Sequence, residues 1–341
     1  MRVKLNRFTG VCLLAFLCCS ACQKGQEPSI AWYWWKTVYA PDSAELAYFN
    51  ATGAKQLGVR LFDVDTSARY PFPSPKGILQ QKQAWPDSVK VVPVVYITRA
   101  ALLQPGSLDS LAVRIARLVG SLMKQSNWTE IQWDHDWTGS TRANYFALLR
   151  LLKQQAIFNN KTFAATIRLH QLRQTQPGLM PPVRKGLLMV YNMGHLTQAG
   201  NTNSILDEAV WKSYQSDLKK YPLPLDWAMP VFAWAVQFRQ NRFVAILNGV
   251  RAKEVLASGL VDALPNGQYR CRKAGFLAGF GVQAGDVLRL EGADAATLEK
   301  IVRILRHERN DVQPTLYFFD WQNKHIPYFS SYDIQRISQA H

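Results

Sequence analysis

Two kinds of segment alternate along most of the chain when its hydrophobic and polar positions are followed in order. Short runs rich in β-branched and aromatic residues are followed by longer stretches in which apolar residues recur three and four positions apart. This alternation is typical of a parallel sheet covered by helices. Strands are predicted at residues 30–38, 57–65, 89–98, 130–137, 162–170, 186–193, 226–236 and 315–321, and amphipathic helices at 107–125, 140–155, 204–221 and 295–307.

A glycine-rich segment interrupts the pattern between the seventh and eighth predicted strands. Residues from about 245 to 292 contain β-like pieces at 268–276 and 286–291, which we interpret as a small α/β insertion rather than a separate domain. Eight strand–helix units within residues 29–341 favour an α/β fold of the (β/α)8 TIM-barrel type over an open sheet. Ser204, with Asp207 three residues later, indicates an N-cap for the third predicted helix.

The first residues predict export and lipid attachment. Three basic residues precede a short apolar run over residues 11–17, which is too short to span a bilayer as a permanent helix. Small residues then precede Cys22. We interpret residues 1–21 as a lipoprotein signal peptide and residues 22–28 as a lipidated tether, with a plain secretory peptide cut nearby as the alternative. The expected location is the bacterial cell envelope, anchored most plausibly to the outer membrane on its periplasmic or surface side.

Cysteine usage and charge narrow the possible partners. Three of the five cysteines lie in the predicted leader, so the mature chain keeps Cys22 and Cys271 and no disulfide is expected. The formal charge of +16 falls to +13 without the leader, and no acidic residue occurs between Asp136 and Asp207. An electropositive half favours anionic partners. An exported lipoprotein rarely meets nucleic acid, so anionic glycans or lipid headgroups are expected; a solvated basic surface without a partner is the alternative.

Candidate chemistry gathers where the predicted strands end, the place where (β/α)8 barrels carry their active sites. Side chains alternate along a strand, so Asp134 and Asp136 of the fourth strand share a face with Gln132. Adjacent carboxylates repel and burial raises their pKa, which lets one act as a general acid. Glycosidic cleavage needs such an acid together with a second carboxylate. The other ionisable candidates are Asp63 and Asp65 on the second strand, Arg168 and His170 on the fifth, and Asp320 on the eighth.

Aromatic residues at the same ends are candidate sugar-binding groups, because sugar faces stack on such rings. These are Trp34 and Trp35 of the first strand, Trp234 and Trp321. Structural roles remain open for each group: the tryptophans as core residues, His170 as an interior histidine, and Asp134 as a partner of Arg168. The aspartate pairs could also bind Ca²⁺ or Mg²⁺. Neither an EF-hand-like loop nor a close histidine pair supports a metal, so no metal and no cofactor are expected.

Several separated motifs carry a resemblance to known families. The motifs are Trp34-Trp35-Lys36-Thr37, Phe62-Asp63-Val64-Asp65, Asp134-His135-Asp136-Trp137-Thr138, Thr166-Ile167-Arg168-Leu169-His170-Gln171 and Met189-Val190-Tyr191-Asn192-Met193-Gly194. With these motifs the chain resembles an uncharacterised family of bacterial lipoproteins with a glycosidase-like barrel, and more distantly the family 18 glycoside hydrolases, which include chitinases. The resemblance implies a glycan partner, anionic or N-acetylated, and adds Tyr191 and Asn192 to the substrate-binding candidates.

The resemblance departs from family 18 at one decisive position. Thr138 stands where that family has its catalytic acid, and a threonine cannot protonate a leaving oxygen at neutral pH. Two hypotheses follow. The chain is either a glycosidase-like hydrolase that draws a carboxylate pair from Asp63, Asp65, Asp134, Asp136 and Asp320, or a glycan-binding envelope lipoprotein that kept the cleft and lost the acid.

Overall fold

A computed structural model of the chain describes residues 28–67, 72–200, 202–309 and 313–340. Eight parallel strands form a closed barrel, because the first strand pairs both with the second and with the last. The predicted (β/α)8 fold is therefore confirmed. The barrel strands are β1 (Ser29–Trp34), β3 (Gln56–Asp65), β6 (Lys90–Ile97), β7 (Glu130–Asp134), β8 (Thr162–Arg168), β9 (Lys185–Met189), β10 (Leu225–Pro230) and β18 (Thr315–Phe319). Three short strands, β2 (Val38–Tyr39), β4 (Ser74–Lys76) and β5 (Gln80–Gln81), lie in the connections.

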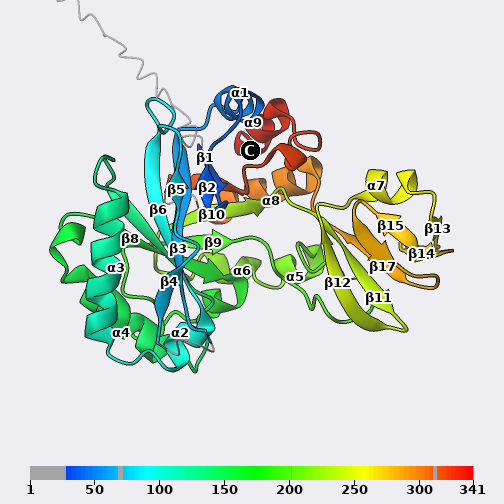
Figure 1. The fold of residues 1–341 in the computed structure, drawn as a ribbon. Coiled ribbons are helices and arrows are strands. Elements are labelled where there is room, and N and C mark those ends of the chain that lie inside the picture. The colour runs from blue at the N-terminus through cyan, green and yellow to red at the C-terminus, as the bar shows by residue number, and fades with distance from the viewer. Residues whose placement is uncertain (1–27, 68–71, 201, 310–312, 341) are drawn as a thin grey trace, which may run out of the picture.

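Helices surround the barrel, and the longest lie where apolar residues recur at helical spacing. In α3 (Leu108–Leu122) the side chain of Ser107 caps the first turn, and in α8 (Ala295–Glu308) Asp294 does the same. Figure 1 shows α3 and α4 (Arg142–Lys153) side by side on the barrel wall, away from the insertion. The other helices are α1 (Ser43–Ala51), α2 (Arg99–Leu103), α5 (Glu208–Lys212), α6 (Gln215–Leu218), α7 (Ala252–Ala257) and α9 (Ser331–Ser338), with 3₁₀ turns at Ala156–Phe158, Leu169–Arg173 and Asn323–His325.

The insertion forms a small sheet of its own beside the barrel (Figure 1). It begins earlier than the sequence pattern indicates, because the seventh barrel strand ends at Pro230 and the next strand, which starts at Trp234, pairs antiparallel with its neighbours. A separate core around Leu247, Val255 and Leu288 supports it. Its strands are β11 (Trp234–Arg239), β12 (Arg242–Asn248), β13 (Val261–Ala263), β14 (Tyr269–Cys271), β15 (Gly275–Leu277), β16 (Phe280–Val282) and β17 (Val287–Glu291).

The helix predicted over residues 204–221 differs in the structure. It consists of two short helices, α5 and α6, separated at Ser213 and Tyr214. The N-cap is Asp207, whose carboxylate accepts bonds from the backbone N–H groups of Ala209 and Val210. Ser204 is buried and donates its hydroxyl to Glu291 of the insertion. A long-range contact therefore occupies the side chain that the local sequence assigns to the cap.

Tightly packed rings fill the barrel interior below the strand ends. Tyr33 stacks on Tyr317 at 4.9 Å between ring centroids and donates its hydroxyl to Gln132. Gly58 makes room for this ring, because a Cβ there would lie 2.5 Å from Tyr33 Cε1. The interior is thus a packed core, and a ligand can enter only at the strand ends.

At the strand starts, buried ions pair with one another. The ammonium of Lys185 lies 3.0 Å from Glu130 and 2.5 Å from Asp226, and Lys90 lies 3.1 Å from Glu130. Asp226 also accepts a bond from the backbone N–H of Thr315 on the neighbouring strand β18. We refer to Lys90, Glu130, Lys185 and Asp226 as the buried ion cluster. It links residues at the starts of β6, β7, β9 and β10.

Candidate functional site

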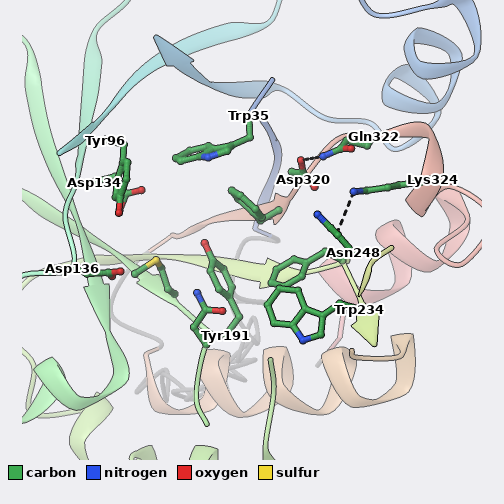
Figure 2. Close-up of a pocket in the computed structure, with 14 residues that line it drawn as sticks. Trp35, Tyr96, Asp134, Asp136, Tyr191, Trp234, Asn248, Asp320, Gln322 and Lys324 are labelled. Atoms are coloured by element: carbon green, nitrogen blue, oxygen red, sulfur yellow. Dashed lines mark hydrogen bonds between the residues drawn. The ribbon is translucent and has the colours of Figure 1, made fainter. Parts of the chain in front are cut away.

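A cleft of about 360 Å³ opens at the C-terminal ends of the barrel strands. Figure 2 shows carboxylates on two sides of it: Asp134 and Asp136 on one side, and Asp320 on the other. Aromatic rings lie between them. Residues of both the barrel and the insertion line the cleft, since Trp234 and Asn248 belong to β11 and β12.

Asp134 is the last residue of β7 and lies deep in the cleft. Its carboxylate accepts a hydrogen bond from the Thr166 hydroxyl of the neighbouring strand, at 2.8 Å. Burial and, after it, the charge of Asp136 raise the pKa of Asp134 from 3.8 to about 7, although the Thr166 bond and the charge of Arg168 act against this shift. Asp134 therefore holds a proton in a large fraction of molecules at neutral pH.

Asp136 lies at the rim, on the loop that follows β7. Its side chain is 47% exposed, and one carboxylate oxygen lies 3.4 Å from the guanidinium of Arg168. Arg168 also donates to the backbone carbonyl of Asn192, at 3.2 Å. The intervening His135 points the other way, into the helical layer, where its ring contacts the carbonyl of Ile97 and the hydroxyl of Thr141. The alternation predicted for this segment therefore directs both aspartates away from His135.

Asp320 follows β18 on the opposite side of the cleft and is largely buried. It accepts hydrogen bonds from the amide of Gln322 and, at 3.1 Å, from Nε2 of His325. Burial lowers the pKa of His325, while its bond to Asp320 opposes that shift. Two neutral donors thus hold Asp320 in place.

Aromatic side chains form much of the wall between the carboxylates. Trp35 packs against Phe319 at 5.1 Å between ring centroids, and Phe232 packs against Trp234 at 5.2 Å. The indole N–H of Trp234 donates to Glu291 at 2.8 Å, which fixes the ring orientation. Because Trp35 and Trp234 keep part of their surface exposed to the cleft, each offers a face on which a sugar ring can stack.

Several predicted site residues lie elsewhere. Trp34 and Trp321 are each 1% exposed, and their rings pack on each other at 5.3 Å within the core rather than lining the cleft. The indole N–H groups donate to the backbone carbonyls of Val38 and Glu45. Since β1 ends at Trp34, the next residue, Trp35, is the one that reaches the cleft.

The two aspartates of β3 are held by cations outside the cleft lining. Asp63 pairs with Arg60 at 2.7 Å, and Asp65 pairs with Lys76 at 2.7 Å and accepts from Thr98. His170, predicted at the end of the fifth strand, belongs instead to the 3₁₀ turn Leu169–Arg173 and is exposed. Burial and the charge of Arg168 lower the pKa of His170. The strand ends at Arg168, so Thr166, Arg168 and His170 do not form one continuous strand face.

Thr138, at the position of the family 18 acid, is exposed and does not line the cleft. Its hydroxyl lies 2.9 Å from that of Ser140, and its carbonyl accepts from Thr141 and Arg142 where α4 begins. The local role of Thr138 is therefore to start a helix.

Sequence reasoning missed several residues that line the cleft. Tyr96 near the end of β6 lies beside Asp134, and burial together with the charge of Asp134 raises its pKa to about 12. Tyr96 lies near the end of a predicted strand, and this position could have identified it as a candidate site residue. Asn248 and Lys324 lie on the insertion and on the turn after β18, where no motif marks them. Met189, Phe232, Phe319 and Gln322 complete this group.

Comparisons with solved structures support the assignment of the fold. The chain is similar to the spore cortex-lytic enzyme SleL of Bacillus megaterium QM B1551, with a TM-score of 0.59, 10% identity, and coverage of 92% of this chain and 75% of SleL. It is also similar to a chitinase of Chromobacterium violaceum ATCC 12472, with a TM-score of 0.56, 7% identity, and coverage of 92% and 100%. The barrel has a glycoside-hydrolase-like fold.

A third similar structure is catalytic domain 2 of the Ostrinia furnacalis Group II chitinase, a variant in complex with penta-N-acetylchitooctaose. Its TM-score is 0.52 at 11% identity, with coverage of 92% of this chain and 96% of that domain. No protein-family model matches the chain, and no curated protein matches it. At these low sequence identities the similarity establishes the fold alone. The reaction has to be inferred from the residues in the cleft.

Two further observations concern metals and membranes. Within residues 28–67, 72–200, 202–309 and 313–340, no group of three or more His, Cys, Asp or Glu side chains is arranged to hold a metal ion. None of the helices in this part of the chain combines the length and apolar character that crossing a membrane requires.

Cys271 is a buried free thiol, and burial raises its pKa to about 11. The predicted signal peptide and Cys22 lie outside the described residues.

Proposed function

We propose that the cleft binds a glycan and that the protein hydrolyses a glycosidic bond there, with Asp134 as the proton donor. The observation that carries this proposal is the contrast between the two neighbouring carboxyl groups. Asp134 lies deep in the cleft, is bonded to a hydroxyl and has a pKa raised to about 7, whereas the side chain of Asp136 is 47% exposed and paired with Arg168. Glycosidic cleavage uses two carboxyl groups whose environments set their pKa values apart.

In the proposed reaction, Asp134 gives its proton to the glycosidic oxygen as the bond to the anomeric carbon breaks. The departing sugar leaves with a hydroxyl group. Asp136 acts as the second carboxylate: it either takes the proton of an attacking water or bonds to the anomeric carbon before water replaces it. In both routes a water molecule is consumed and its hydroxyl ends on the anomeric carbon. If Asp136 acts as the base, it then releases the water proton to solvent and Asp134 takes one up; if Asp136 acts as the nucleophile, Asp134 takes the proton of the second-step water directly.

We propose N-acetylated sugar chains as the substrate class. The aromatic wall of Trp35 and Trp234 suits the apolar faces of sugar rings. Lys324 and Asn248, which lie 3.4 Å apart at the insertion side of the cleft, offer polar contacts to the substituents. Likeness to a barrel that binds penta-N-acetylchitooctaose supports the same choice.

The test is release of reducing ends from N-acetylglucosamine oligomers and from peptidoglycan, measured beside direct binding of the same oligomers. Hydrolysis by the wild type that is lost in Asp134→Asn, with binding retained, is the expected result. Asp65→Asn is the matched control, since Asp65 pairs with Lys76 outside the cleft. Hydrolysis that survives in Asp134→Asn contradicts the assigned role of Asp134.

A second function, glycan binding without cleavage, is favoured by Thr138. A hydroxyl that is bonded to Ser140 outside the cleft lining cannot replace a catalytic carboxylic acid. This alternative predicts binding of the oligomers by the wild type with no release of reducing ends. In that case Trp35→Ala should weaken binding, while Asp134→Asn should change it little.

We also propose that the protein is a lipoprotein of the bacterial envelope, acylated at Cys22. The basic leader, the short apolar run and the small residues before Cys22 support this proposal. Metabolic labelling with a fatty acid should mark the wild type and leave Cys22→Ala unlabelled. Label retained in Cys22→Ala would contradict acylation at this residue.

A further inference from the structure

The end of the barrel opposite the cleft carries a set of exposed cations. Helix C-termini and strand N-termini meet at this end of a (β/α)8 barrel. One cation follows α3, one ends α4, and three precede β3, β9 and β10. We call this set the basic face; its members are Lys55, Lys124, Lys153, Arg184 and Lys219.

Few acidic residues balance this face; Glu308, which lies 3.2 Å from Lys219, pairs with one of its five cations. Glu130 and Asp226 lie beneath it, buried and already paired with Lys185. Loops run directly into the barrel strands at this end. Asp87 is the one acidic residue among their described residues. Burial lowers the pKa of Lys153 and the nearby charge of Arg184 lowers it further, which shows that like charges lie together here. Such a surface attracts polyanions.

The chain enters the barrel at this same end. Ser29, the first residue of β1, pairs with Thr315 at the start of β18, and its backbone N–H bonds to the carbonyl of Pro314. Pro28 is the sixth residue after Cys22. Six fully extended residues reach at most about 20 Å. A lipid on Cys22 would therefore hold the basic face close to the membrane surface.

We propose that the basic face docks on the anionic phospholipid headgroups of the membrane that carries the Cys22 lipid, so that the cleft opens away from the bilayer. The inference rests on acylation at Cys22 and is independent of whether the cleft hydrolyses its ligand. Cations near an anionic leaflet add to the membrane affinity that a lipid chain supplies, and the attraction fades within a Debye length. The short tether and the basic face thus act on the same end of the barrel.

The test uses the full-length lipidated protein reconstituted in vesicles, with amine acetylation of individual lysines followed by mass spectrometry. Vesicles of phosphatidylglycerol mixed with phosphatidylcholine are compared with vesicles of phosphatidylcholine alone. Anionic vesicles should slow the labelling of Lys55, Lys124 and Lys153 by about fivefold or more, while Lys253 and Lys273 on the insertion keep the same rate. Salt at 1 M should abolish the difference, since the Debye length falls to ~3 Å.

Matched charge reversals distinguish an effect of the basic face from an effect of the protein's net charge. The triple variant Lys55→Glu, Lys124→Glu and Arg184→Glu should return Lys153 to its labelling rate on neutral vesicles. The control triple variant Arg242→Glu, Arg270→Glu and Lys273→Glu changes the charge equally on the insertion and should leave Lys153 protected. Equal labelling of both lysine groups on anionic vesicles overturns the proposed orientation. Failure of the wild type to float with neutral vesicles overturns the tether on which the proposal rests.

Discussion

At the strand starts of the barrel, Glu130 and Asp226 lie against the ammonium of Lys185, whereas at the strand ends Asp134 faces the cleft and is bonded to a threonine hydroxyl. Burial raises the pKa of both Asp226 and Asp134, but Lys185 opposes the shift at Asp226 far more directly than Arg168 does at Asp134. The same residue type is therefore a structural ion at one end and the proposed proton donor at the other. The group in contact with each aspartate, a lysine ammonium in one case and a threonine hydroxyl in the other, decides its role.

The largest effect is expected for catalysis at the cleft. Asp134→Asn should lower the rate of glycan hydrolysis by about 10²–10⁴-fold, because an amide cannot donate the proton that the leaving oxygen requires. Initial rates of reducing-end release measure this change. Asp65→Asn should keep the wild-type rate to within about twofold, because its ion pair lies outside the cleft lining. Comparable losses in both variants would remove the distinction between Asp134 and the paired aspartates.

The buried ion cluster should respond to mutation through stability. Lys185→Met leaves Glu130 and Asp226 without their shared cation, and should lower the free energy of unfolding by about 3–5 kcal/mol. Urea denaturation measures this loss. The control is Lys124→Met, an exposed lysine, which should change stability by less than about 0.5 kcal/mol. A stability change for Lys185→Met as small as the control would show that the cluster contributes little.

A third prediction concerns the pH dependence of stability at the cleft. Because the pKa of Asp134 is raised from 3.8 to about 7, the folded state binds a proton that the unfolded state releases between these values. The wild type should therefore lose stability as pH rises from about 4 to about 7, whereas Asp134→Asn lacks this loss. The variant should gain about 2–4 kcal/mol relative to the wild type across that window. Parallel stability curves for the two proteins would contradict the raised pKa.

The smallest effect is expected from the aromatic wall. Trp35→Ala should weaken oligosaccharide binding by about tenfold, since one ring contact contributes roughly 1–1.5 kcal/mol. Isothermal titration calorimetry measures the affinity. Trp85 is a matched control: it is partly buried, bonds to Ser126 and lies outside the cleft lining. If Trp35→Ala and Trp85→Ala bind equally well, the ligand does not stack on Trp35.

Much of the fold followed from the sequence because strand and helix patterns are local. The starts of the eight barrel strands fell within one residue of the predicted positions, and alternation alone indicated the carboxylates at the end of the fourth strand. Long-range contacts account for the differences. Ser204 could cap a helix by local rules, yet it bonds to Glu291, which is 87 residues away. The strand predicted at residues 226–236 includes the first three residues of β11, which belong to the insertion because their partners are antiparallel.

The candidate site was predictable in part. Asp134, Asp136 and Asp320 line the cleft, as do Trp35, Tyr191, Asn192 and Trp234. Residue type and spacing do not distinguish Asp63 from these cleft residues. In the structure, an irregularity in β3 between Arg60 and Phe62 shifts the strand register next to Asp63, and Arg60 forms an ion pair with Asp63. Trp34 and Trp35 are adjacent and look equivalent in sequence. Only the end of β1 places one in the core and the other in the cleft.

The measurement that tests the central claim most directly is the titration of Asp134 itself. Carboxyl carbons of aspartate can be followed by ¹³C NMR from pH 3 to pH 9, and the resonance that disappears in Asp134→Asn identifies the group. The account predicts a midpoint for Asp134 of about 7, caused first by burial and then by the charge of Asp136. A midpoint near 4 would mean that Asp134 is ionised throughout the physiological range. It could then not serve as the proton donor of the cleft.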